Sequence, residues 1–303
     1  MGNTFYFGFE KVIIEFLQSF LNPFTEALSV FFTYFGEETA LILILGYLYW
    51  CYDKEFGKFV ATNVSVGLIL CPMVKNIICR TRPYMDIETV KAVRPPEPDK
   101  DPFDIVAQGY SCPSGHSLNS AIVYGSLPVY KKNNKFLKII AIVCPLLVGF
   151  SRVILGAHYP TDVLFGWTLG AVVIFLISFL QRKVQRKWIL YVCLLAVSAI
   201  GIFYCRTDDY FTGLGVMLGL FLVFPFEEKF VNFEKSPGVL DSVLRIVLGV
   251  VIFVILNSAL KIILKSDVQM GQFLLRTVRY AIDIFVLFGL YPILFKHFPR
   301  KKA

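Results

Sequence analysis

The chain has 303 residues, of which 56% are hydrophobic and only 17% are charged, and its formal net charge is +8. Soluble domains carry about 25% charged residues, and apolar runs long enough to cross a bilayer recur along most of this sequence. The composition therefore excludes an ordinary soluble protein and predicts a polytopic membrane protein.

The excess positive charge lies at the ends of apolar runs. It gathers in three clusters: Lys131, Lys132, Lys135 and Lys138; Arg182, Lys183, Arg186 and Lys187; and Arg300, Lys301 and Lys302. The positive-inside rule expects such clusters in cytoplasmic turns. We therefore predict membrane lipids, and no nucleic acid, as partners; the oligomeric state stays open.

The first segment, residues 1–37, is aromatic-rich but is interrupted by Asn22-Pro23 and carries Lys11, Glu15 and Glu26. Proline breaks the hydrogen-bond ladder of a helix, and carboxylates are costly in hydrocarbon. We expect two short helices that lie at the membrane interface. One broken spanning helix is the alternative.

The rest of the chain contains candidate spans. They cover residues 40–52, 59–78, 117–130, 136–150, 163–180, 188–204, 211–226, 239–260 and 278–295. Several are shorter than the 20 or so residues that a span needs, so their ends must extend into the flanking sequence. The pattern predicts an all-α membrane helical bundle of about nine spans.

One long polar stretch interrupts these runs, between Pro83 and Pro113. A loop of this length is usually functional or disordered. It could be a lid or a substrate-access element, or only a solvated connector. Cys79 and Cys112 flank it, and a disulfide between them is a hypothesis. The chain has seven cysteines but no CxxC pair, so we expect no metal site on them.

The sequence KNIICRTRP, residues 75–83, ends the second of these spans. Lys75 and Arg82 are seven residues apart, about two helical turns, and share a face if the helix continues to Pro83. Arginine offers a planar fork of donors to phosphate, and lysine a mobile point charge. Arg80 competes for this role, but its spacing from Lys75 fits a common face less well. Alternatively, the side chains of Lys75 and Arg82 only extend their charges to the membrane–water interface.

The sequence PSGH, residues 113–116, opens the next span. Pro113 and Ser114 fit the ordinary start and cap of a helix. Gly115 would let a backbone N–H group approach an anion at a helix N-terminus. His116 could protonate a leaving oxygen there.

The sequence SRVILGAHYPTD, residues 151–162, carries the strongest signal. His158 and Asp162 are four residues apart, one turn on a helix face. A carboxylate on one imidazole nitrogen fixes the tautomer and leaves the other nitrogen as a nucleophile. Alternatively, Asp162 only caps the helix start that Pro160 marks.

These three fragments resemble the signature KxxxxxxRP, PSGH and SRxxxxxHxxxD of the type 2 phosphatidic acid phosphatase superfamily, and every signature position matches. The resemblance implies phosphate hydrolysis without a cofactor or a metal ion. The residues that it implies for phosphate binding are Lys75, Arg82, Ser114, Gly115 and Arg152. His158 would attack phosphorus and form a phosphohistidine, Asp162 would orient it, and His116 would protonate the leaving oxygen and then activate water.

The resemblance also implies a division of the chain. Residues 1–37 would form the interfacial helices, residues 38–182 the membrane phosphatase core, and residues 183–303 accessory transmembrane helices. Simpler members of the family have a six-helix core, to which this chain adds C-terminal spans. This layout is similar to glucose-6-phosphatase and to some bacterial membrane phosphatases.

We therefore expect a membrane phosphatase for a lipid phosphate or diphosphate, such as polyprenyl diphosphate, phosphatidic acid or phosphatidylglycerophosphate. A sugar-phosphate phosphatase is the alternative, and a non-catalytic transporter or binding protein is a third. The charge pattern predicts that the site faces outside. We expect an integral protein of a bacterial cell membrane, or of the endoplasmic reticulum if the source is eukaryotic.

Overall fold

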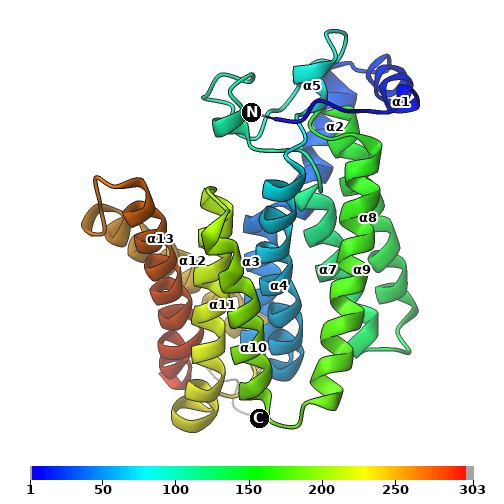
Figure 1. Cartoon of the computed structure of the whole chain (residues 1–303). Coiled ribbons are helices and arrows are strands. Elements are labelled where there is room, and N and C mark those ends of the chain that lie inside the picture. The colour runs from blue at the N-terminus through cyan, green and yellow to red at the C-terminus, as the bar shows by residue number, and fades with distance from the viewer. Residues whose placement is uncertain (1, 298–303) are drawn as a thin grey trace. The chain divides into compact units, whose positions relative to one another are not determined.

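The computed structural model describes residues 2–297 and shows an all-helical chain (Figure 1). Within this part of the chain there is no β-strand, and one isolated bridge pairs Asn3 with Arg80. The predicted all-α fold is thus confirmed. The basic cluster Arg300–Lys302 lies outside the described residues.

The helices form two compact units, of which the first is made of residues 1–41 and 70–176 and the second of residues 42–69 and 177–303. The predicted boundaries at residues 37 and 182 stay predictions. Three helices belong partly to each unit: α3 (Glu38–Tyr47), α4 (Lys54–Ile78) and α9 (Pro160–Lys183). The first unit also holds α1 (Gly8–Gln18), α2 (Pro23–Thr33), α5 (Pro83–Asp86), α6 (Ile105–Gln108), α7 (Gly115–Tyr130) and α8 (Lys135–Ile154).

The second unit holds the remaining helices, α10 (Lys187–Ala199), α11 (Asp208–Phe226), α12 (Val239–Ile263) and α13 (Gln269–Phe285). In it α11 packs on α10 and α13, and α13 also packs on α12. A buried carboxylate, Glu227, accepts a hydrogen bond from Nζ of Lys54 at 2.8 Å.

All seven cysteines are free thiols, so the hypothesis of a disulfide between Cys79 and Cys112 is wrong for this structure.

Six helices among the described residues are long and apolar enough to cross a membrane: α4, α8, α9, and the helical stretches Asp208–Val231, Val239–Ile263 and Gln269–His297. A bent pair, Pro23–Gly36 with Ala40–Tyr52, could make a seventh. Two predicted spans correspond to shorter helices, because α7 has 16 residues and rises only about 24 Å, and Lys187–Phe203 also falls short. The predicted count of nine stays a prediction, as does the interfacial position of α1 and α2.

The helices α7, α8 and α9 follow one another as an antiparallel series, and two glycines let α9 approach α7 closely. A Cβ atom at Gly166 would lie 2.7 Å from the backbone oxygen of Ser114, and one at Gly170 would lie 2.9 Å from Cβ of Ala121. Small residues four apart permit this backbone contact between membrane helices. The close approach brings the first turn of α9 to the first turn of α7.

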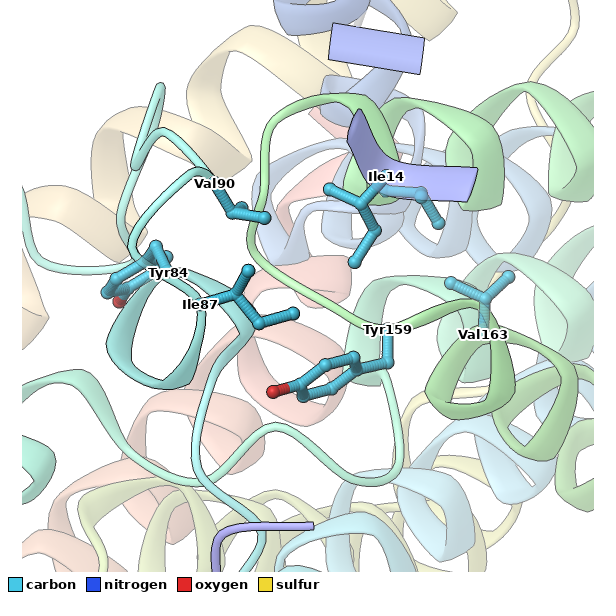
Figure 2. Close-up of a cluster of buried hydrophobic side chains, with 7 residues drawn as sticks. Ile14, Tyr84, Ile87, Val90, Tyr159 and Val163 are labelled. Atoms are coloured by element: carbon cyan, nitrogen blue, oxygen red, sulfur yellow. The ribbon is translucent and has the colours of Figure 1, made fainter. Parts of the chain in front are cut away.

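A cluster of buried apolar side chains includes the start of α9 (Figure 2). It joins Ile14 of α1 and Tyr84 of α5 to Tyr159 and Val163, at the start of α9. Ile87 and Val90, from the long polar stretch, belong to it as well, and so does Val153 of α8. The beginning of that stretch is therefore part of the core and is not a solvated connector.

Candidate active site

The first signature fragment does not form one continuous helix. The helix α4 ends at Ile78, and Cys79 adopts a left-handed conformation with φ of 55°. Arg82 is the N-cap of the separate short helix α5, which Pro83 opens. The expectation that Lys75 and Arg82 share a helix face is therefore wrong, because the chain turns between them.

Arg82 is buried and is held by backbone carbonyl groups. Its Nη1 donates to the oxygen of Ala157 at 2.9 Å, and its Nη2 donates to the oxygen of Gln108 at 2.7 Å. Its Nε donates to the oxygens of Gln108 and Gly109. Arg82 thus links the end of the long polar stretch to the residue that precedes His158.

Ser114 caps α7, as the sequence predicted. Its Oγ accepts from the backbone N–H of Ser117 at 3.4 Å, and its side chain is fully buried. Its own N–H donates to the backbone oxygen of Asp162 at 3.0 Å. Gly115 and His116 follow in the first turn, half-buried, where the free N–H groups of a helix favour an anion.

His158 lies in the turn between α8 and α9 and is 2% exposed. Its Nδ1 is 3.6 Å from Oδ2 of Asp162, which is within ion-pair range but longer than a hydrogen bond. Asp162 is fully buried in the first turn of α9, and its Oδ2 accepts from the N–H of Tyr159 at 2.9 Å. Asp162 therefore both caps the helix and faces the histidine, so the two alternatives from the sequence occur together.

Arg152 lies in the last turn of α8 and is 3% exposed. Its Nη1 donates to Oγ1 of Thr33, on α2, at 2.9 Å. Among the described residues its Nε has no hydrogen-bond partner, although it is buried. Burying a donor without a partner costs free energy. A bound anion would supply the missing acceptor.

The predicted cations act electrostatically on the two histidines. Burial, followed by the positive charges of Arg82, Arg152 and Lys75, lowers the pKa of His158 well below its ordinary value. Burial also lowers the pKa of His116, and Arg152, His158, Lys75 and Arg82 act on it in the same direction. Three permanent cations therefore act on both imidazoles. Such a field suits a phosphate group.

Next to the two histidines, Arg80 has another role than the phosphate binding for which the sequence made it a competing candidate, and Glu10 was not predicted as part of the site. The Arg80 side chain is buried, and its Nη1 donates to Oδ1 of Asp162 at 2.7 Å. Its Nη2 donates to Oε2 of Glu10, on α1, at 2.7 Å. The Arg-x-Arg pattern at 80–82 was visible in the sequence, but nothing near Glu10 distinguishes it from the other acids of the N-terminal segment.

Two family models match this chain. One is described as the PAP2 superfamily and matches residues 57–186; the other is described as a PAP2 superfamily phosphatase transmembrane extension and matches residues 211–302.

Three curated relatives are also similar. Phosphatidylglycerophosphatase B of Bacillus subtilis is 41% identical over 33% of this chain and 51% of its own length. Undecaprenyl-diphosphatase of Sulfolobus acidocaldarius is 28% identical over 52% of this chain and 69% of its own length. Lipid A 1-phosphatase of Rhizobium etli is 28% identical over 39% of this chain and 47% of its own length. The chain thus spans about half of the length of the first and third relatives.

A solved structure is similar as well: a transmembrane PAP2-type phosphatidylglycerolphosphate phosphatase from Bacillus subtilis. It is 27% identical and has a TM-score of 0.44; the match covers 60% of this chain and 90% of that one.

Proposed function

Because the chain belongs to the PAP2 superfamily, we propose that it is a membrane phosphatase that hydrolyses the terminal phosphate of a lipid phosphate or diphosphate. The observation that carries this proposal is the pair of His158 and Asp162, 3.6 Å apart, with Arg82 bonded to the backbone oxygen of the residue before His158. The charges of Lys75, Arg82 and Arg152 act on both histidines. A transferring phosphoryl group spreads negative charge over three oxygens, and fixed donors around them supply most of the catalysis.

The nucleophile in this proposal is Nε2 of His158. Asp162 lies on the Nδ1 side of the ring at 3.6 Å, so it can hold the proton on Nδ1. The low pKa keeps the free imidazole neutral, which leaves the Nε2 lone pair available for attack. In the first step a bond forms between Nε2 and phosphorus as the bond from phosphorus to the lipid oxygen breaks.

His116 is the proposed general acid, which gives its proton to the leaving lipid oxygen. In the free protein burial and neighbouring cations lower the pKa of His116. A bound phosphate carries negative charge that opposes those cations, so substrate binding favours the protonated imidazole. In the second step neutral His116 takes a proton from water. The water oxygen attacks phosphorus, the bond to Nε2 breaks, and inorganic phosphate leaves.

The remaining residues bind the phosphate oxygens. Arg152 contributes its unpartnered Nε, and Lys75, half-buried in the last turn of α4, contributes a mobile charge. Ser114 and the N–H of Gly115 belong to the start of α7, whose free backbone donors point toward an anion. Arg82 would donate some of its N–H groups to the phosphate oxygens and the others to the backbone carbonyl groups that hold it.

The chain is an integral membrane protein, and we propose that its site faces the outside of a bacterial cell membrane. The site residues lie where α7 begins, where α8 ends and where α9 begins. The opposite ends of these helices carry Lys131, Lys135 and Lys183, which the positive-inside rule places in the cytoplasm. A site at the far end meets lipid head groups at the interface while the acyl or prenyl chains stay in hydrocarbon.

The names of the curated relatives support a lipid substrate, since all three refer to lipids that carry a phosphate or diphosphate. The test is a phosphate-release screen with the full-length protein in detergent. Polyprenyl diphosphate, phosphatidic acid and phosphatidylglycerophosphate should be compared with a hexose phosphate. We expect turnover of at least one lipid. Turnover of the hexose phosphate alone would favour the sugar-phosphatase alternative, and no turnover of any substrate would refute the proposal.

A further inference from the structure

Arg80 is the centre of a buried ionic network beside the proposed nucleophile. Its side chain is 1% exposed, and Glu10 and Asp162 are both fully buried. Its two terminal nitrogens each donate to one of these carboxylates at 2.7 Å. Its Nε donates to the backbone oxygen of Phe5 at 2.9 Å. Burying three charges is expensive, and it is tolerated only where geometry and hydrogen bonding are nearly complete.

The network fixes the orientation of Asp162. Arg80 holds Oδ1 at 2.7 Å, and the N–H of Tyr159 holds Oδ2 at 2.9 Å. The guanidinium is itself fixed, because its central carbon lies 3.8 Å from the centre of the Tyr159 ring and 4.8 Å from that of Phe5. With both oxygens held in this way, Oδ2 is presented to Nδ1 of His158.

Glu10 connects this arrangement to the N-terminal helix α1. Its Oε1 accepts from Oγ1 of Thr161 at 2.6 Å and from the N–H of Thr161 at 3.2 Å. Its Oε2 accepts from Arg80 and from the N–H of Phe7. Thr161 stands next to Asp162 in the first turn of α9, so α1 is attached directly to the turn that carries the orienting carboxylate.

Arg80 differs from the three cations of the phosphate site. Arg82, Arg152 and Lys75 are the cations that act most strongly on His158, whereas Arg80 acts on Asp162. Both terminal nitrogens of Arg80 are neutralised by buried carboxylates, those of Asp162 and Glu10, whereas the terminal nitrogens of Arg82 meet only uncharged backbone carbonyl groups. The side chain is therefore placed to hold a catalytic carboxylate and not the substrate.

We propose that Arg80 is a positioning residue for Asp162, and that Glu10 makes α1 a working part of the active site as well as a membrane-proximal helix. This inference rests on the proposed function, because its effect is exerted through the attack of His158. Without Glu10, Arg80 would have a free donor and could shift toward the phosphate site. Without Arg80, Asp162 would lose the partner that fixes its plane.

The test compares the full-length wild type with Arg80→Gln, Arg80→Lys and Glu10→Gln, each assayed in detergent for kcat, KM and inhibition by inorganic phosphate. The control is Glu26→Gln, an exposed acid on α2. We expect Arg80→Gln to lower kcat on the order of 10²-fold, since small misplacements of catalytic groups have effects of this size. Arg80→Lys should lower kcat less than Arg80→Gln does. Glu10→Gln should lower kcat roughly tenfold, as is typical when a residue that supports a catalytic group indirectly is changed.

The inhibition constant for inorganic phosphate separates positioning from binding. It should stay near the wild-type value in the Arg80 variants, because Arg80 does not contact the phosphate. A rise of this constant in step with the loss of kcat would make Arg80 a phosphate ligand and overturn the inference, as would a folded Arg80→Gln variant with normal kcat. If Arg80→Gln does not fold, Glu10→Gln decides, and a normal kcat in that variant refutes the link to α1. An inactive wild type would refute the proposed function too; an active wild type with normal variants refutes only this inference.

Discussion

Nδ1 of His158 lies 3.6 Å from Oδ2 of Asp162, which follows it by four residues. The pair does not lie along one helix turn as simple spacing suggests, because His158 precedes the helix and Asp162 is in its first turn. Pro160 starts α9 between them, and the turn brings the imidazole back over the carboxylate. The gap is slightly longer than a hydrogen bond, as is common in catalytic groups before substrate binds.

The first prediction concerns the nucleophile. His158→Ala should abolish phosphate release, because it removes the imidazole that forms the bond to phosphorus in the proposed mechanism. The measurement is release of inorganic phosphate from the best lipid substrate, at equal amounts of monodisperse protein. His297→Ala provides a matched control, since this histidine is exposed. Normal turnover in His158→Ala would end the phosphohistidine mechanism.

The second prediction concerns Arg152, whose Nε is buried without a hydrogen-bond partner among the described residues. Arg152→Met should raise the barrier by about 3–4 kcal/mol, as loss of a single donor in an oxyanion hole does. Thr33→Val should have a smaller effect in the same direction, because it removes only the partner that holds Nη1 at 2.9 Å. Arg182→Met, at the exposed end of α9, is the control. Equal rates for Arg152→Met and the control would remove Arg152 from the site.

The third prediction is a pH dependence. Burial and then neighbouring cations lower the pKa of His158 below 6.5, so the neutral, nucleophilic form persists into acid. The acid limb of kcat/KM, which reports the free enzyme, should therefore lie below pH 6.5. In Arg152→Met one of the cations that lower this pKa is absent, so the limb should move to higher pH. A wild-type limb at or above 6.5 would contradict the assignment of His158.

The fourth prediction concerns metal ions. Lys75, Arg82 and Arg152 supply positive charge around the two histidines, which is the role that magnesium has in many other phosphoryl-transfer enzymes. Excess EDTA, followed by dialysis, should leave kcat unchanged. Activity that EDTA removes and that Mg²⁺ restores would refute metal independence.

The sequence was sufficient to choose candidate site residues, but it did not predict their arrangement. Motif chemistry was sufficient to select His158, His116 and the cations as candidates, because each residue type has few roles in such a pattern. It was not sufficient for Arg80, since whether an arginine meets a phosphate or a carboxylate depends on which segment packs against it. That segment is α1, and Glu10 lies 70 residues away in the sequence. Sequence spacing also failed to predict the position of Arg82 relative to Lys75, because α4 ends at Ile78 and Cys79 adopts a left-handed conformation.

The fifth prediction concerns the contact between α7 and α9. A Cβ atom at Gly166 would lie 2.7 Å from the backbone oxygen of Ser114 and 3.1 Å from the N–H nitrogen of Leu118, and neither backbone group can move aside alone. Gly166→Ala should therefore push α9 away from α7 and lower stability by about 1–3 kcal/mol, as overpacking does.

The Gly166→Ala variant should also lose activity, because the same displacement stretches the 3.0 Å hydrogen bond from the N–H of Ser114 to the oxygen of Asp162. Thermal unfolding in detergent and kcat measure the two effects together. Gly8→Ala is the matched control, since a Cβ there meets nothing within 4 Å. If Gly166→Ala unfolds at the wild-type temperature with normal kcat, close packing of these two helices is not what brings Asp162 to the start of α7.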